Sequence, residues 1–217
     1  MPITQIAGTV ATQPEFRSTT GDKQVDRYAS FYELARTEVL GEDYAIESLD
    51  RQSEVIVVAP HGGWIEPGTT EITKAIADGE LSYYVFIGLK PGRRHEDLHV
   101  SSERFDEPTA LALIAESQTV VGIHGMQNNA IGEDIWVGGR DVELCRDIVE
   151  ALRASGFAAT SRRPGQSLAG HAATNVCNRG KRRTGVQLEI SRRLRDRLRA
   201  EPDLLEAFGR TIRLVIA

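Results

Sequence analysis

Residues 54–63 read Glu-Val-Ile-Val-Val-Ala-Pro-His-Gly-Gly, and this stretch decides the fold. The unbroken run from Val55 to Val58 predicts a strand that is buried on both faces, as in a sheet covered by helices. The strand ends in a proline and a glycine-rich turn, which carries His61. We therefore expect an α/β protein with a histidine at the end of its first strong strand.

Alternating strands and helices are expected along the rest of the chain. Further strands are expected at Ser82–Gly88, Leu98–Ser101, Thr119–His124, Ile135–Val137, Phe157–Thr160 and Gly185–Ile190. Helices are expected at Phe31–Leu40, from about Pro67 to Gly79, at Glu107–Glu116, at Asp141–Ala154, and at roughly 192–200 and 203–214. This alternation is typical of an α/β fold with a mixed, mostly parallel sheet flanked by helices. We expect an irregular N-terminal arm over residues 1–27 and a single α/β hydrolase domain over residues 28–217.

Composition narrows the function classes. The chain has 217 residues, a formal net charge of −5 and a pI near 5.6, which argue against nucleic acid as a partner. No stretch approaches the roughly 20 apolar residues of a membrane-spanning helix, and residues 1–16 do not resemble a secretory signal, so we expect a cytoplasmic protein with no membrane partner. Cys145 and Cys177 are too few for a disulfide scaffold and are expected to be reduced and buried.

Metal-ligating and proton-transferring residues follow several expected strands. His61 and His124 each end a strand in a glycine-containing turn, Glu66 follows His61 by five positions, and Glu189 lies near the end of the last strand. Zinc hydrolases commonly hold the ion with two histidines and one glutamate and leave a fourth position for water. If the strands are neighbours, His61, Glu66 and His124 can converge on one ion. Glu189 would then suit the general base.

Each of these residues also has an ordinary structural interpretation. A histidine at a strand end is usually a hydrogen-bonded structural residue. Glu66 could simply favour the N-terminus of the following helix. Glu189 could pair with Arg192 or Arg193. The residues by themselves leave both interpretations open.

A second metal motif competes with this one. Residues 95–99 read His-Glu-Asp-Leu-His and match the H-E-x-x-H signature of metalloproteases. That signature requires a helix, where positions i and i+4 share a face. Pro91 and Gly92 precede the motif, and no amphipathic helical pattern runs through it. We interpret the match as chance, although His99 could line the site from its expected strand.

Several blocks of the sequence resemble a known family. Residues 59–69, Ala-Pro-His-Gly-Gly-Trp-Ile-Glu-Pro-Gly-Thr, resemble the metal-binding segment of phage-type poly-γ-glutamate hydrolases. The similarity continues in the same order through residues 82–84, 97–100, 105–108, 122–125, 177–180 and 185–191, and covers roughly residues 44–195. The first and last blocks are the most specific.

The resemblance implies a fold, a cofactor and a reaction. It implies a single-domain mixed α/β fold similar to that of zinc carboxypeptidases. It also implies one Zn²⁺ ion on His61, Glu66 and His124, with Glu189 as the general base. The implied reaction is cleavage of γ-glutamyl amide bonds by phage enzymes that strip host capsules, with release by lysis as the phage-like route.

The resemblance suggests a substrate-binding role for cationic side chains. Poly-γ-glutamate carries an α-carboxylate on every residue, and arginine binds carboxylates with two parallel hydrogen bonds. Arg179 is the first candidate for substrate binding, and Arg94, His99 and Arg193 are further candidates. The other arginines between residues 192 and 199 are expected to form a solvated helix face.

Departures from the family leave rival functions open. Trp64 stands where a small residue is expected, and the loops at residues 126–133 and 164–173 differ from the family pattern. One rival is a zinc amidase that acts on a cell-wall peptide or an N-acyl amino acid. Another is a non-catalytic binding module on a degenerate hydrolase fold. The sequence does not determine the oligomeric state, the exact polymer or the choice between endo and exo cleavage.

Overall fold

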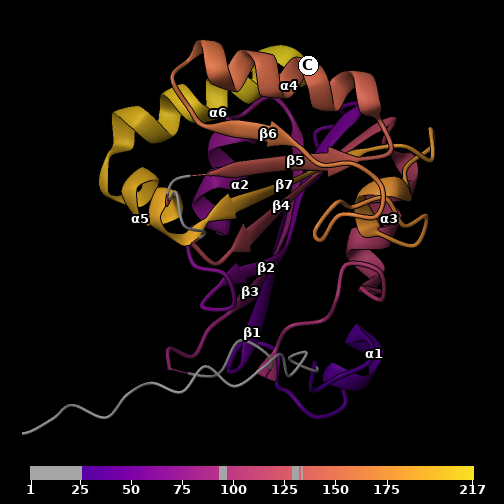
Figure 1. Cartoon of the computed structure of the whole chain (residues 1–217). Helices are drawn as coiled ribbons and strands as arrows, with labels where there is room; N and C mark the ends of the chain where they lie inside the picture. The colour runs from indigo at the N-terminus through magenta and orange to yellow at the C-terminus, as the bar shows by residue number, and fades with distance from the viewer. Residues whose placement is uncertain (1–25, 93–96, 129–131, 133) are drawn as a thin grey trace, which may run out of the picture.

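The computed structural model describes residues 26–92, 97–128, 132 and 134–217 (Figure 1). The strands are β1 Tyr44–Leu49, β2 Val55–Gly63, β3 Ser82–Gly88, β4 Thr119–Met126, β5 Ile135–Gly139, β6 Ala159–Ser161 and β7 Val186–Ser191. They form a seven-stranded sheet in the order β1-β3-β2-β4-β7-β5-β6. This mixed sheet with flanking helices confirms the expected α/β class.

Helices cover both faces of the sheet. They are α1 Phe31–Leu34, α2 Thr69–Ala77, α3 Pro108–Glu116, α4 Val142–Ala154, α5 Arg192–Ala200, α6 Pro202–Ile216 and the short 3₁₀ helix η2 Val176–Asn178. Helices α2, α4, α5 and α6 supply the core of one face, and α1, α3 and η2 supply the core of the other. The protein is therefore a three-layer α/β structure.

Strand β2 shows why the sheet is buried on both sides. Val55, Val57 and Ala59 pack into the core formed with α2, α4, α5 and α6. Ile56 and Val58 pack into the opposite core, with α1 and α3. Alternate side chains of a strand point to opposite faces, so a continuous apolar run fits a central strand. The interpretation of residues 54–59 is confirmed.

The central strands share one direction. Strands β3, β2, β4 and β7 are successive parallel neighbours, whereas β1 is antiparallel to β3 and β5 is antiparallel to β7. Strand β6 runs parallel to β5 at the other edge. The carboxyl ends of β2, β4 and β7 consequently meet at the same edge of the sheet, which is where sites form in such folds.

Two expected elements differ from the structure, and one observed strand was not expected. No strand forms over Leu98–Ser101, where residues 99–101 have no regular secondary structure. The helix expected at 31–40 ends at Leu34, and the chain continues in turns, in which Arg36 and Thr37 donate to the carbonyl oxygens three residues earlier. Strand β1 was not predicted, since this edge strand has only one buried residue, Tyr44, to mark it.

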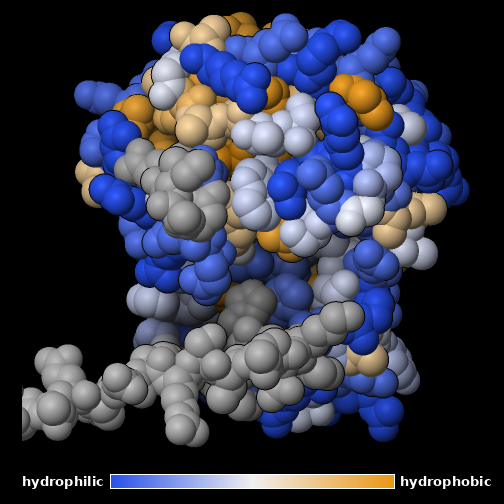
Figure 2. Space-filling model, in the orientation of Figure 1, coloured by the Kyte–Doolittle hydropathy of each residue, from blue (hydrophilic) through white to orange (hydrophobic). Residues whose placement is uncertain are grey.

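The surface and the cysteines agree with the composition. Figure 2 shows a mainly hydrophilic face with small apolar patches between the charged side chains. Both Cys145 and Cys177 are buried free thiols, as expected. Among the described residues, no helix is long and apolar enough to cross a membrane.

Close backbone packing beside β7 gives a test of the fold. Gly139 has φ +125°, and a Cβ there would overlap the carbonyl oxygen of Gly185, whereas Gly156 has φ +85° and open space around it. We expect Gly156→Ala to cost about 1–2 kcal/mol from backbone strain. Gly139→Ala should cost about 2 kcal/mol more, because overpacking adds to the strain. Urea unfolding of the two variants measures this difference, and equal losses would contradict the packing described.

Candidate metal centre

An irregularity in β2 sets the direction of His61. Strict alternation after Val57 and Ala59 would point His61 into the same core as these residues. The register of β2 against β3 shifts between Ala59 and Gly62, a stretch that includes Pro60, which has no N–H to donate to the sheet. The side chain of His61 instead lies on the opposite face, where its Nε2 is 2.9 Å from the carbonyl oxygen of Val100.

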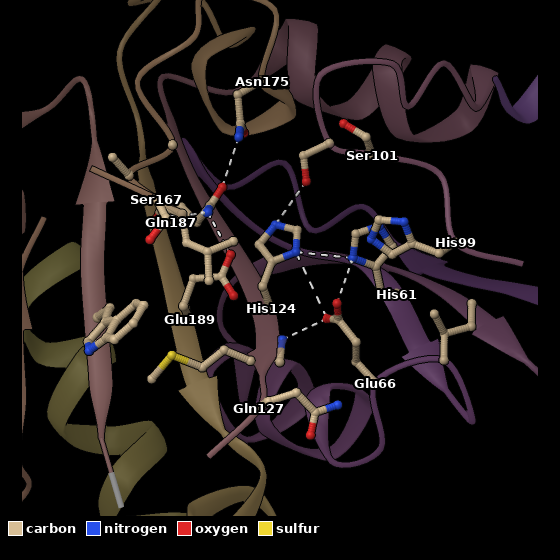
Figure 3. A pocket seen from close by; sticks show the side chains of 18 of the residues that line it. His61, Glu66, His99, Ser101, His124, Gln127, Ser167, Asn175, Gln187 and Glu189 are labelled. Atoms are coloured by element: carbon tan, nitrogen blue, oxygen red, sulfur yellow. Dashed lines mark hydrogen bonds and ion pairs between the residues drawn. The ribbon is translucent and has the colours of Figure 1, made fainter. Parts of the chain in front are cut away.

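Three predicted ligands converge at the carboxyl edge of the sheet (Figure 3). The Nδ1 atoms of His61 and His124 are 3.2 Å apart, and His61 Nδ1 is 3.2 Å from Glu66 Oε1. His124 Nδ1 is 4.0 Å from Glu66 Oε2. The backbone N–H of Gly125 donates to Glu66 Oε2 at 2.6 Å and fixes the carboxylate. All three side chains are buried.

The outer nitrogens of both imidazoles are held by other groups. A carbonyl oxygen only accepts, so His61 Nε2 carries the hydrogen that Val100 accepts. His124 Nε2 is 3.1 Å from Ser102 Oγ, which can accept in the same way. Such outer contacts orient metal-binding histidines and fix their tautomer. They leave both Nδ1 atoms directed at the Glu66 carboxylate.

This arrangement fits a cation. A tetrahedral ion with bonds of about 2.0–2.1 Å keeps its ligand atoms roughly 3.3 Å apart, close to the two separations of 3.2 Å. Without a metal, a proton has to occupy the space between these lone pairs. Burial lowers the pKa of His61, yet the Glu66 carboxylate raises it above the ordinary value. Burial and the neighbouring His61 lower the pKa of His124 to about 3.

Glu189 lies beside this cluster. It is paired in register with His124 across β4 and β7, and it is buried. Burial and the charge of Glu66 raise the pKa of Glu189 well above its usual value, against the opposing effects of Arg195 and of a hydrogen bond from Gln187. A raised pKa makes this carboxylate a stronger proton acceptor than an ordinary glutamate, which suits a general base.

His99 lies on the other side of His61. The two rings are 4.0 Å apart between centroids, and ligand atoms of His61, Glu66 and His99 all lie within 4.8 Å of one another. His99 Nδ1 is 2.6 Å from Asp26 Oδ1. Asp26 Oδ2 also accepts from the backbone N–H of Ser101 at 3.0 Å. His99 is thus a possible alternative third ligand as well as a residue of the pocket wall.

The competing H-E-x-x-H motif lies only partly within the described residues. His95 and Glu96 are outside them, and His99 is in irregular backbone and not in the strand that was expected. His99 reaches the site through its own contacts with Asp26 and His61.

Arg195 corrects the expectation of a solvated helix face. It is only 3% exposed, and its guanidinium donates to the carbonyl oxygens of Ile190, Met126 and Pro67. A Cβ on Gly125 would overlap this guanidinium, so the glycine makes room for it. Arg195 is therefore a buried cation under the candidate centre.

Arg179 fastens two loops together. Its guanidinium donates to the carbonyl oxygens of Thr174 at 2.7 Å, Phe105 at 2.7 Å and Glu103 at 2.8 Å. Arg179 is also absent from the residues that line the described part of the pocket. This placement does not favour the substrate-binding role predicted for Arg179, because each nitrogen of the guanidinium already donates to a backbone carbonyl oxygen.

The other residues predicted to bind substrate differ in their position relative to the pocket. Arg94 lies outside the described residues. The backbone N–H of Arg193 donates to Asn128 Oδ1, and its side chain is not part of the described pocket lining. His99 does line the pocket, and so does Arg192, which sequence reasoning left in the solvated group.

A pocket of about 1110 Å³ opens onto the cluster. Its lining includes His61, Glu66, His124 and Glu189, together with the loop at residues 165–172. Figure 3 shows the labelled side chains gathered around this space. Trp64, the departure noted in the sequence, also lines the pocket and is 53% exposed. It therefore offers a flat apolar surface at the rim.

Sequence reasoning missed the groups that hold the cluster in place. These are Asp26, Ser102, Asn175, Gln187 and Arg195. Only Gln187 had a usable signal, because it precedes Glu189 by two positions in a strand and so shares its face. Asp26, Ser102 and Asn175 come from other segments that only the fold brings near, and Arg195 lies in the helix directly after β7, where its charge gave no sign of burial.

Comparison with known proteins finds relatives that match most of this chain. UPF0714 protein YmaC of Bacillus subtilis (strain 168) is 38% identical over 174 residues, which cover 80% of this chain and 72% of YmaC. UPF0714 protein YndL of the same strain is 36% identical over 166 residues. The chain spans 64% of the length of YndL and 59% of the prophage-derived YoqZ, so it is shorter than these relatives.

Two solved structures are similar over most of the chain. A bacteriophage poly-γ-glutamate hydrolase matches with a TM-score of 0.81 and 30% identity, covering 88% of this chain and 96% of that one. YndL in its zinc-free apo form matches with a TM-score of 0.82 and 32% identity, covering 88% and 97%.

The fold and the cluster define a mixed α/β protein with a buried histidine–glutamate cluster at the carboxyl edge of its sheet. The poly-gamma-glutamate hydrolase family model matches residues 28–208. The chain belongs to the poly-γ-glutamate hydrolase family and is therefore a hydrolase.

The contacts of Asp26 give a pH-dependent prediction. Burial by itself would raise the pKa of Asp26, but His99, Ser101 and Arg104 lower it from 3.8 to about 2. A carboxylate with a depressed folded-state pKa stabilises the fold above the unfolded value, and this stability is lost as pH falls through the folded value. We expect Asp26→Asn to be less stable than wild type at pH 7, with a difference that shrinks from pH 4 towards pH 2. Urea unfolding across this range measures it, and a difference independent of pH would contradict the assignment.

Proposed function

We propose that the protein is a zinc-dependent hydrolase that cleaves the γ-glutamyl amide bonds of poly-γ-glutamate. One Zn²⁺ ion would be held by His61, Glu66 and His124, and Glu189 would act as general base. The observation that carries this proposal is the convergence of the Nδ1 atoms of His61 and His124 and the Glu66 carboxylate, with separations of 3.2, 3.2 and 4.0 Å. The zinc-free form in which the similar YndL was solved supports the choice of metal.

Each residue has a defined task in this proposal. Bound there, zinc would supply Lewis acidity towards water and towards a carbonyl oxygen. The N–H of Gly125 keeps Glu66 from rotating, and the contacts of His61 and His124 hold their rings in place. Glu189 accepts the proton of the attacking water and passes it to the leaving nitrogen.

The substrate-binding residues have to compensate the negative charge of the polymer. Poly-γ-glutamate alternates α-carboxylates with short aliphatic segments. We assign His99 to a carboxylate contact, since it lines the pocket, and we retain Arg94 as a second candidate. Trp64 offers apolar surface to the aliphatic segments. Arg179 and Arg193 are not included, because neither lines the described pocket.

A zinc amidase for another amide remains the rival function. A cell-wall peptide or an N-acyl amino acid would use the same ligands and the same base. The departures at Trp64 and in the loop at residues 164–173 concern the pocket wall and leave the metal chemistry unchanged. The match to a hydrolase family and the intact ligand set disfavour a non-catalytic module.

The polymer assay tests substrate and metal together. We expect purified protein to shorten poly-γ-glutamate, a chelator to stop it and added Zn²⁺ to restore it. Glu189→Gln is the matched control: it should keep zinc and lose on the order of 10²–10⁴-fold in turnover, the contribution of a positioned general base. No shortening by zinc-loaded protein would discard the polymer and direct the search to other amides. Comparing γ- and α-linked glutamyl substrates would then distinguish the rivals.

Two histidine variants identify the third ligand. We expect His124→Ala to bind zinc at least roughly 10-fold more weakly, because a direct ligand matters at least as much as the groups around it. His99→Ala should retain zinc, since Asp26 already holds the Nδ1 of His99. Zinc competition with a coloured chelator measures both affinities. Loss of zinc in His99→Ala with retention in His124→Ala would reassign the ligand.

A further inference from the structure

Glu189 is not held by the metal cluster. Its partner among the described residues is Gln187, which lies two positions earlier on β7 and therefore on the same face of the strand. Both side chains are buried, as is Asn175 in the turn before η2. We propose that Gln187 and Asn175 are positioning residues that orient the carboxylate of Glu189, an inference that rests on the proposed role of Glu189 as general base.

The three side chains form a continuous chain of hydrogen bonds. The backbone N–H of Cys177 donates to Asn175 Oδ1 at 3.1 Å. Asn175 Nδ2 donates to Gln187 Oε1 at 2.8 Å. Gln187 Nε2 then donates to Glu189 Oε1 at 2.7 Å. Figure 3 shows Asn175, Gln187 and Glu189 in this sequence along one side of the pocket.

The backbone fixes the direction of this chain. The N–H of Cys177 can only donate, so the oxygen of Asn175 must face it and the amino group must face Gln187. The oxygen of Gln187 then faces Asn175, and its amino group faces Glu189. Gln187 Nε2 also lies 3.4 Å from the carbonyl oxygen of Leu168, which only accepts and requires the same orientation.

This fixed direction delivers an N–H to one oxygen of Glu189. Oε1 is occupied by the amide, so Oε2 is the oxygen left for the pocket that Glu189 lines. The same amide reaches Leu168 in the loop at residues 165–172, which forms a wall of that pocket. Gly170 lets this loop approach, because a Cβ there would come within 3.0 Å of the Gln187 Cβ. The proposed base Glu189 and the loop at residues 165–172 therefore both contact the buried side-chain amide of Gln187.

Two substitutions at Asn175 separate the effect of hydrogen-bond direction from the effect of side-chain packing. Asn175→Asp keeps the shape and the contact with Cys177, but it presents an acceptor to Gln187. Gln187 must then turn and bring its oxygen against Glu189. Asn175→Ala removes the partner and leaves the amino group of Gln187 in place, held by Leu168 and Glu189.

We therefore expect the isosteric variant to be the more damaging one. In zinc-loaded protein, kcat for poly-γ-glutamate should fall on the order of 10²-fold in Asn175→Asp and by roughly 10-fold or less in Asn175→Ala, with KM little changed in both. Gln118→Glu, at the opposite end of β4, adds the same charge away from the site and should keep wild-type kcat. A purely structural role predicts the reverse order, because Asp preserves the volume and Ala does not.

A double-mutant cycle between residues 175 and 189, measured by the unfolding midpoint, tests the inference without an activity assay. Asn175→Asp should lower the unfolding midpoint of the zinc-loaded protein, and it should lower it less when Glu189 is replaced by Gln. A glutamine at residue 189 can donate to the turned amide of Gln187, whereas a carboxylate cannot. An equal drop in both backgrounds would overturn the inference. If wild type does not cleave the polymer, the proposed function fails, while this coupling between residues 175 and 189 still decides the orientation.

Discussion

The site depends on the parallel alignment of β2, β4 and β7 in the centre of the sheet. Parallel neighbours bring their carboxyl ends to one edge, so residues more than 60 positions apart in sequence meet there. Helices on both faces bury these strands and restrict their movement. Side chains at the ends of such strands have well-defined positions, and a ligand set needs that precision.

A local break in the alternation of β2 is as important as the alignment. Without the register shift between Ala59 and Gly62, His61 would point into the apolar core with Val57 and Ala59, away from His124. The break sends the imidazole to the face that carries His124 and Glu189. The register shift in β2 is thus required for His61 to reach the cluster.

Burial of charge is balanced mainly by backbone groups. Glu66 is held by the N–H of Gly125, and His61 by the carbonyl oxygen of Val100. Arg195 lies under the centre and donates to three carbonyl oxygens, which accounts for an arginine that is almost fully buried. Arg179 does the same for the loops around Phe105 and Thr174. Arg179, which the family resemblance suggested for substrate binding, and Arg195, which was expected in solvent, therefore both hold backbone segments around the pocket.

The sequence by itself determined the α/β class and the central strands, because strand burial is a local pattern. Strand-end chemistry, also a local pattern, singled out His61, Glu66, His124 and Glu189 as candidates, whose roles stay a prediction. The family resemblance was equally readable from short blocks of residues. Only the tertiary structure decided which way His61 points, that Arg195 is buried, and that Asn175 and Gln187 stand behind Glu189. These features depend on a register shift and on contacts between distant segments. Local patterns of hydrophobicity and charge carry no record of either.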